Sequence, residues 1–301
     1  MADYRIIPVA PPLYLVVLTP PIRGFDDFIG VWVHAAEPRF IVDTGPAVTA
    51  DSLLAALAGI MTEEPDYILL THIHMDHAGA VGDVAAALPD AVFVCHPRAI
   101  DHLVNPEKLQ AGTIKTLGDT GRAYGPIKPV APERLMDAEQ FNHEHLDAIL
   151  TPGHAPHHVS FLTSGGMLFA GEASGVNIRF AEDAVYMRPA TPPRFKLETS
   201  VASLDRLIAA QPDTICYSHL GMRSRATDLL YQHREQLFFW KETIAKEMQT
   251  SNDQALEDRC AQRLLKTDPL LAGLAHADTA ALGRETYFIK NSIQGIAGYL
   301  G

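Results

Sequence analysis

Three histidines and one aspartate lie within residues 71–77, a segment that reads Thr-His-Ile-His-Met-Asp-His. The preceding residues 66–70 are mostly apolar, follow a Glu-Pro pair and are predicted to form a short buried strand. The following residues 78–88 are rich in Ala, Val and Leu and are predicted to form a helix. The cluster therefore occupies a turn from a strand into a helix, and this turn favours an α/β fold.

The polar side chains of this segment are expected to point in two directions. Side chains alternate along an extended turn, so His72 and His74 should lie on the same side. Asp76 and His77 follow on the next bend, where they can face a second point in space. Imidazole nitrogens and carboxylate oxygens are the ligands that zinc and similar cations take in proteins. The spacing thus favours two metal ions over one.

The charge and the apolar runs restrict the partners of this chain. Its 301 residues carry a formal net charge of −12, which argues against nucleic acid and anionic membranes and leaves a small-molecule substrate. The apolar run at 13–18 is too short to span a bilayer and lacks a signal-peptide pattern, so it is predicted to be the first strand. Cys95, Cys216 and Cys260 have no disulfide or zinc spacing and are interpreted as reduced thiols of a cytoplasmic protein.

The chain changes character near residue 225. Short apolar strands alternate with helices before it, whereas a long amphipathic helix is predicted at 228–248. We therefore expect a catalytic domain at 1–225 and a C-terminal helical extension at 226–301 that packs on or near the active-site face. Residues 106–132, rich in Gly, Pro and Thr, are expected to form a long connection. The other predictions are strands at 29–34, 39–42, 67–70, 91–95, 148–150, 158–162, 167–170 and 214–217, and helices at 50–61, 78–88 and 197–210.

Two parts of the chain share one order of features. Residues 39–45 and 167–173 are both predicted strands that lead an acidic residue into a turn. Residues 65–72 and 212–219 both begin with Pro-Asp, continue as a strand, and end with a hydroxyl residue followed by a histidine. A predicted helix separates the two strands in each part. We interpret the parts as related halves packed face to face, with functional residues from both halves along one edge.

Further candidate ligands follow other predicted strands. His154 lies in a turn that reads Thr-Pro-Gly-His, and Glu172 and His219 each follow a strand. Catalytic zinc sites have three protein ligands and one open position. No cysteine lies near the cluster, which argues against a closed structural zinc site.

These motifs resemble those of the metallo-β-lactamase superfamily, over roughly residues 10 to 225. The resemblance rests on Asp43, the His-x-His-x-Asp-His signature at 72–77, His154, Glu172 and His219. It implies an αββα sandwich of two mixed β-sheets flanked by helices. The branch resembled is glyoxalase II-like or thioesterase-like, because helical tails of this kind occur there.

The resemblance also implies a role for each motif residue. By its pattern, the ligands of the first ion are His72, His74 and His154, and those of the second ion are Asp76, His77 and His219. The fourth motif contributes an acid that bridges the ions, and Glu172 stands here where the family normally has Asp. Asp43 and His158 are expected to support ligands through hydrogen bonds.

The expected function is a dinuclear metal-dependent hydrolase. Two divalent ions, zinc first and iron or manganese as alternatives, would supply a hydroxide that attacks an ester, thioester or lactone carbonyl. Asp76 would orient that nucleophile or pass a proton to the leaving group. The alternatives are a phosphodiesterase, a non-catalytic metal-binding protein, and an iron-dependent redox enzyme acting on dioxygen, nitric oxide or a persulfide. The redox enzyme is disfavoured because the chain has no flavodoxin module and keeps a histidine at position 74.

Residues 173–196 are expected to form one wall of the substrate pocket. Arg179, Tyr186, Arg188 and Arg194 lie there, and one of them could anchor an anionic group of the substrate. Residues 238–240, Phe-Phe-Trp, are interpreted as core packing of the C-terminal helices, with a substrate lid as the alternative. The apolar helices after residue 225 also offer a surface for a homodimer.

Overall fold

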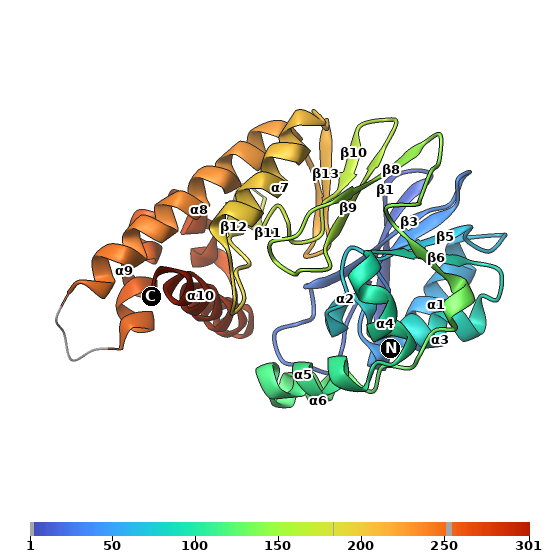
Figure 1. Ribbon diagram of the computed structural model, residues 1–301, viewed down its shortest axis with the longest axis horizontal. Coiled ribbons are helices and arrows are strands. Elements are labelled where there is room, and N and C mark those ends of the chain that lie inside the picture. Colours follow the sequence, from blue (N-terminus) through green and yellow to red (C-terminus); the bar gives the residue numbers. More distant parts are fainter. Residues whose placement is uncertain (1–2, 183, 251–254) are drawn as a thin grey trace.

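The computed structural model describes residues 3–182, 184–250 and 255–301. These residues form a seven-stranded sheet and a five-stranded sheet that face each other, with helices on the outer sides (Figure 1). A small two-stranded hairpin lies beside the five-stranded sheet. The predicted αββα sandwich and the helical C-terminal extension are therefore confirmed.

The seven-stranded sheet is mixed. Its order is β1 (Tyr4–Ala10), β2 (Leu13–Leu18), β3 (Ile29–His34), β4 (Phe40–Val42), β5 (Tyr67–Leu69), β6 (Val92–Cys95) and β7 (Leu135–Asp137). The pairs from β1 to β4 are antiparallel, and those from β4 to β7 are parallel. The prediction that residues 13–18 form the first strand was wrong, because β1 precedes them and pairs with β2 at the edge.

The five-stranded sheet is mixed as well. Its order is β14 (Gly221–Ser224), β13 (Thr214–Tyr217), β10 (Met167–Phe169), β9 (Val159–Thr163) and β8 (Leu146–Leu150). Only β10 and β13 run parallel to each other among these described strands. The sequence did not predict β14, which pairs with β13 through a tight antiparallel turn.

The core between the two sheets comes from alternate residues of each strand. Leu13, Leu15 and Val17 of β2 pack in one apolar cluster with Phe161 of β9 and Phe169 of β10. The other face of β2 belongs to a second cluster that the outer helices complete. Strands buried on both faces carry nearly continuous apolar residues, because neither face meets water.

The outer helices correct two predictions. Residues 106–132 are not a plain connection, because they contain α5 (Glu107–Leu117) and α6 (Asp119–Ala123). The predicted helix at 78–88 is two helices, α2 (Met75–Ala78) and α3 (Val81–Ala87). The remaining helices of the first 225 residues are α1 (Ala50–Ile60), α4 (Ile100–Val104) and α7 (Leu197–Ala209), with 3-10 turns η1 (Ala47–Thr49), η2 (Pro97–Ala99) and η3 (Pro132–Arg134).

A hairpin of β11 (Val176–Ala181) and β12 (Ala184–Arg188) lies between β10 and α7 in the chain and packs against the C-terminal segment Pro269–His276. The C-terminal elements are α8 (Ala226–Met248), α9 (Leu256–Thr267), the 3-10 segment η4 (Pro269–His276) and α10 (Thr279–Leu300), which extend to one side of the molecule (Figure 1). Trp240 is fully buried and donates to Asp268 over 2.7 Å, so this member of the aromatic trio packs in the core.

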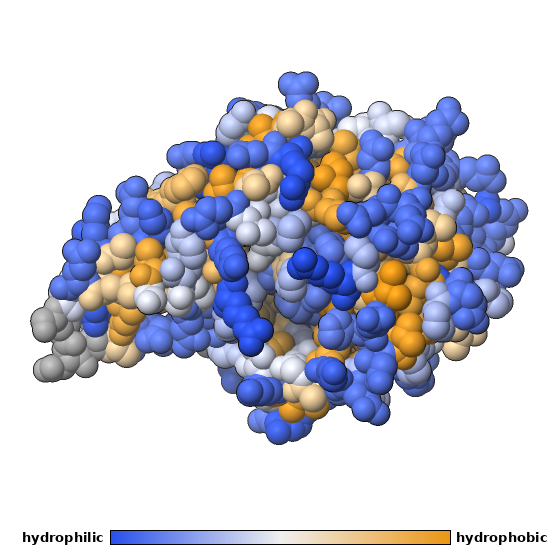
Figure 2. Space-filling view, in the orientation of Figure 1, coloured by the Kyte–Doolittle hydropathy of each residue, from blue (hydrophilic) through white to orange (hydrophobic). Residues whose placement is uncertain are grey.

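One face of the molecule is largely polar. Figure 2 shows hydrophilic residues over most of one face, with hydrophobic residues gathered in smaller patches. No helix within the described ranges is long and apolar enough to cross a membrane. The domain boundary near residue 225 and a homodimer both stay predictions.

Candidate metal centre

The predicted ligands gather where parallel strand pairs of both sheets end. Strand β4 pairs with β5 and β10 with β13, each in parallel and without a bulge. Thr71-His72 follows β5 as Ser218-His219 follows β13, so the two histidines occupy equivalent places in the two sheets. The two similar halves of the sequence therefore correspond to equivalent strand pairs in the two sheets. The candidate ligands of both halves lie at one edge of the sandwich.

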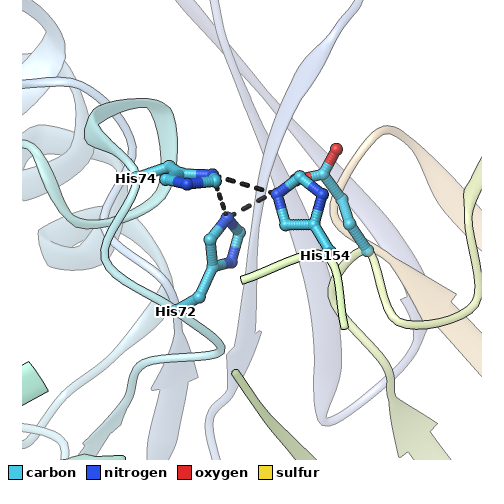
Figure 3. Close-up of side chains that lie close together, drawn as sticks. His72, His74 and His154 are labelled. Carbon is cyan, nitrogen blue, oxygen red and sulfur yellow. Dashed lines mark hydrogen bonds and ion pairs between the residues drawn. The ribbon is translucent and has the colours of Figure 1, made fainter. Parts of the chain in front are cut away.

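The first group consists of His72, His74, His154 and Glu172, whose ligand atoms lie within 4.8 Å of one another. His74 Nδ1 lies 3.0 Å from His72 Nε2 and 2.9 Å from His154 Nε2. Figure 3 shows the three imidazole rings turned toward one another. Glu172 Oε2 lies 2.8 Å from His154 Nε2 and 3.4 Å from His72 Nε2.

The second group consists of Asp76, His77 and His219. Asp76 Oδ2 lies 3.7 Å from His77 Nε2 and 3.9 Å from His219 Nε2. Glu172 belongs to this group as well, because its Oε2 lies 3.5 Å from His77 Nε2 and its Oε1 lies 3.6 Å from His219 Nε2. One carboxylate therefore faces both groups.

The other nitrogens of two of these rings are held by carbonyl oxygens of the protein. His154 Nδ1 donates to Ala190 O over 3.0 Å and His219 Nδ1 donates to Phe28 O over 2.9 Å. A carbonyl only accepts hydrogen bonds, so each Nδ1 carries a proton and each Nε2 is free to act as a ligand. Such anchoring of the far nitrogen is the usual support of a metal-binding histidine.

The atoms present fit a metal ion. Lone pairs 2.9–3.0 Å apart repel each other unless a proton or a cation lies between them. Zinc–nitrogen bonds of 2.0–2.1 Å in a tetrahedron place the ligand atoms roughly 3.3 Å apart, close to the spacings here. In addition, His77 Nε2 is buried and has no hydrogen-bond partner among the described residues, as expected of an atom reserved for a cation.

Burial and charge set the protonation of the centre. Burial lowers the pKa of His74 to about 4 and that of His72 well below its usual value, so both are neutral near pH 7. Burial would also lower the pKa of His77, but the carboxylates of Asp76 and Asp43 raise it well above the usual value. Burial would raise the pKa of Glu172, yet its interactions with the imidazoles of His154, His219 and His72 hold it well below the usual range.

Asp43 connects the two sheets behind the ligands. Its Oδ1 accepts from Thr71 N over 2.8 Å, and its Oδ2 accepts from His77 Nδ1 over 2.8 Å and from Ser218 Oγ over 3.2 Å. The hydroxyl of Thr71 also donates to this carboxylate, at 2.9 Å. Sequence reasoning gave Thr71 and Ser218 no role, although the hydroxyl residue before each histidine was the signal that could have revealed one.

His158 supports the turn that carries Glu172. Its Nε2 accepts from Glu172 N over 3.2 Å, and its Nδ1 lies 2.8 Å from Thr151 Oγ1. Gly171 has a φ of +51°, and a Cβ there would lie 2.5 Å from His158 Nε2. The turn therefore requires glycine at this position, and only then can Glu172 reach both ligand groups.

Two predicted substrate residues have other partners. Tyr186 and Arg188 are buried and both donate to Glu285 of α10, over 2.9 Å and 2.6 Å. Their polar groups therefore hold β12 against α10, and their contact with substrate stays a prediction. Arg179 is exposed on β11.

A small hollow adjoins His154 and Glu172 and reaches α8. Its wall includes the hydroxyl residues Thr151, Thr191, Ser200 and Ser203, together with His233 and Leu237 of α8. Residues of α8 in the C-terminal extension therefore line a hollow that adjoins the first ligand group.

An αββα sandwich with imidazole and carboxylate groups gathered at one edge defines a class of metal-binding α/β proteins. A family model described as the metallo-beta-lactamase superfamily matches residues 31–219. The chain belongs to this superfamily.

Individual relatives share about a quarter to a third of the aligned residues. The metallo-beta-lactamase fold-containing protein ST1585 of Sulfurisphaera tokodaii is 30% identical over 185 residues, which are 57% of this chain and 66% of that protein. A hydroxyacylglutathione hydrolase of Cupriavidus taiwanensis is 27% identical over 202 residues, 65% of this chain and 64% of that enzyme. The chain thus spans slightly less than two thirds of the length of these relatives.

Solved structures show the same fold. The crystal structure of the Sulfolobus tokodaii protein ST1585 superposes with a TM-score of 0.66 at 23% identity, covering 94% of this chain and 97% of that chain. A metallo-beta-lactamase family protein of Thermus thermophilus gives a TM-score of 0.60 at 18% identity, covering 100% of this chain and 93% of that chain. The likeness extends over the C-terminal helices as well as the sandwich.

Proposed function

We propose that this protein is a dinuclear metal-dependent hydrolase that cleaves a carboxylic ester, thioester or lactone of a small molecule. The observation that carries the proposal is the position of Glu172 between two ligand groups. Its Oε2 lies 2.8 Å from His154 Nε2, and its Oε1 lies 3.6 Å from His219 Nε2. A carboxylate that faces both groups supports a pair of cations with a shared ligand. The donor set of imidazoles and carboxylates favours zinc, with iron or manganese as alternatives.

Different side chains would have different roles in such a reaction. Two divalent ions in these groups would lower the pKa of a shared water and polarise the substrate carbonyl. Asp76 presents a carboxylate at the edge of the second group, where it can hold a proton of the attacking water or pass it to the leaving group. Asp43 fixes His77 from behind, and Phe28 and Ala190 fix His219 and His154 through their carbonyls.

The relatives support a hydrolase over a redox enzyme or a non-catalytic protein. Hydroxyacylglutathione hydrolases from Cupriavidus taiwanensis and Aeromonas hydrophila are 27% and 28% identical to this chain over their aligned parts. Their name describes hydrolysis of an acyl group carried by glutathione. This similarity favours transfer of an acyl group to water and places acyl thioesters first in a substrate screen.

The test combines metal analysis with a substrate panel. The full chain is purified without chelator, its metal content is measured, and it is assayed with thioesters, oxygen esters, lactones, a phosphodiester and a persulfide under oxygen. We expect about two zinc ions per chain and hydrolysis of an acyl substrate that Asp76→Ala reduces at least about 100-fold. Turnover of the phosphodiester alone would establish a phosphodiesterase. Iron together with oxygen uptake would overturn the hydrolase.

A further inference from the structure

Phe28 holds His219 at two points. Its carbonyl oxygen accepts from His219 Nδ1 over 2.9 Å. Its ring also stacks on the imidazole of His219, with ring centroids 4.0 Å apart and planes 12° apart. The hydrogen bond fixes which nitrogen of His219 faces the second ligand group, and the stacking fixes the plane of its ring.

The ring of Phe28 is also covered by α10. The guanidinium carbon of Arg284 lies 4.0 Å from the centroid of the Phe28 ring. Phe28 thus contacts both a cation of the C-terminal extension and a candidate metal ligand of the sandwich. Phe25 packs against the Phe28 ring edge-to-face, with centroids 5.1 Å apart.

Arg284 is itself held in place. It donates to Glu285 Oε1 over 2.8 Å and to the carbonyl of Gly24, which lies in the same loop as Phe28. Gly24 has a φ of +84°, and a Cβ there would lie 2.6 Å from Ala280 O of α10. The loop that carries Phe28 therefore lies directly against the first turns of α10.

Arg284 has a buried charge partner in Glu285. Burial alone would raise the pKa of Glu285, but Arg188 and Arg284 hold it below its usual value. The buried Glu285 carboxylate is thus ionised and shared by the two guanidiniums. A buried guanidinium with its charge partner on one side can place its flat face on the Phe28 ring, where the cation–π attraction is strong because water is excluded.

We propose that Arg284 and Phe28 are positioning residues of the second ligand group, so that α10 sets the affinity of the second metal ion. The stack Arg284–Phe28–His219 holds the His219 ring in the plane that directs Nε2 toward Asp76 and Glu172. This inference rests on the two-ion centre of the proposed function. It assigns the C-terminal extension a part in metal binding, although the extension contributes no ligand within the described residues.

Stepwise metal titration tests the proposal without a substrate. Metal-free full-length protein is titrated with Co²⁺, followed by its visible absorption, and then with Zn²⁺ against a competing chelator. Phe28→Leu removes the ring and keeps the carbonyl, so we expect affinity for the second ion to fall about 10-fold or more while the first is unchanged. Arg284→Met should also lower the affinity for the second ion. Arg284→Lys should lower it less, because lysine keeps a cation over the Phe28 ring.

Phe40→Leu is the matched control. Phe40 is buried and stacks on His34 with centroids 4.9 Å apart and planes 11° apart, but His34 is not a candidate ligand. Thermal unfolding of each metal-free variant measures the loss of packing. Phe40→Leu should lose stability and keep both ion affinities. Equal loss of second-ion affinity in Phe40→Leu, or none in Phe28→Leu, would overturn the positioning role and leave the two-ion centre intact. Wild-type protein that binds a single ion would overturn both.

Discussion

Asp43 Oδ2 and His77 Nδ1 lie 2.8 Å apart, and both side chains are almost fully buried. Asp43 follows β4 with a φ of +64°, a left-handed conformation that a non-glycine residue keeps only where its surroundings hold it there. The surroundings are the hydroxyl and amide of Thr71 from one sheet and the hydroxyl of Ser218 from the other. One carboxylate thus fixes a ligand ring and couples the ends of both sheets.

Asp43→Asn should lower the affinity for the second metal ion. The amide keeps the shape of the side chain but replaces an acceptor oxygen with an NH₂ group that faces hydrogen-bond donors. We expect His77 to lose its preferred tautomer and the second ion to bind roughly 10- to 100-fold more weakly, measured by competition with a chelator. Ser218→Ala removes only the longest contact to Asp43 and should have a smaller effect. Equal effects of the two variants would contradict this role of the carboxylate.

Two substitutions of Glu172 should distinguish the effect of side-chain length on metal binding from the effect of charge. Glu172→Asp withdraws the carboxylate by one methylene, while His158 holds the backbone nitrogen in place. A shorter side chain cannot face both groups from that backbone position, so metal content should fall from about two ions toward one. Glu172→Gln keeps the side-chain length and removes the negative charge, so it should weaken the binding of both ions. Metal analysis after equilibrium dialysis distinguishes these results, and two tightly bound ions in Glu172→Asp would show that the added length is not needed.

Gly171→Ala should be strongly destabilising. The positive φ disfavours alanine, and the new Cβ would lie 2.5 Å from His158 Nε2 and 2.9 Å from Thr71 Cβ. We expect a loss of about 2 kcal/mol or more in the free energy of unfolding, measured with urea. Gly112→Ala is the control, because Gly112 lies in α5 and, apart from neighbouring backbone of that helix, no described atom lies within 4 Å of the place that its Cβ would take. That variant should be neutral or stabilising by up to about 1 kcal/mol.

The sequence predicted which side chains gather at the candidate metal centre, because each of them follows a short apolar strand and strands of this kind are recognisable from composition. It did not predict α5, which has no fully buried residue and whose Gly and Thr residues resemble those of a loop. The hairpin β11–β12 was not predicted either, because its strands are stabilised by packing against η4 and α10 and not by a local sequence pattern. Contacts between residues far apart in the chain, such as Arg284 with Phe28 or Tyr186 with Glu285, exist only after folding, so no local pattern indicates them.

The free energy of unfolding should decrease in mild acid because of the buried side chain of His233. This histidine of α8 is buried, and burial lowers its pKa to about 4 from the usual 6.5. Between these values the unfolded chain binds a proton that the folded chain does not, so the free energy of unfolding decreases as the pH falls from about 6.5 to about 4. The full contribution is present above pH 6.5 and amounts to roughly 3 kcal/mol. Urea unfolding at several pH values should give a flatter profile for His233→Asn than for wild type, and parallel profiles would show that another group causes the loss.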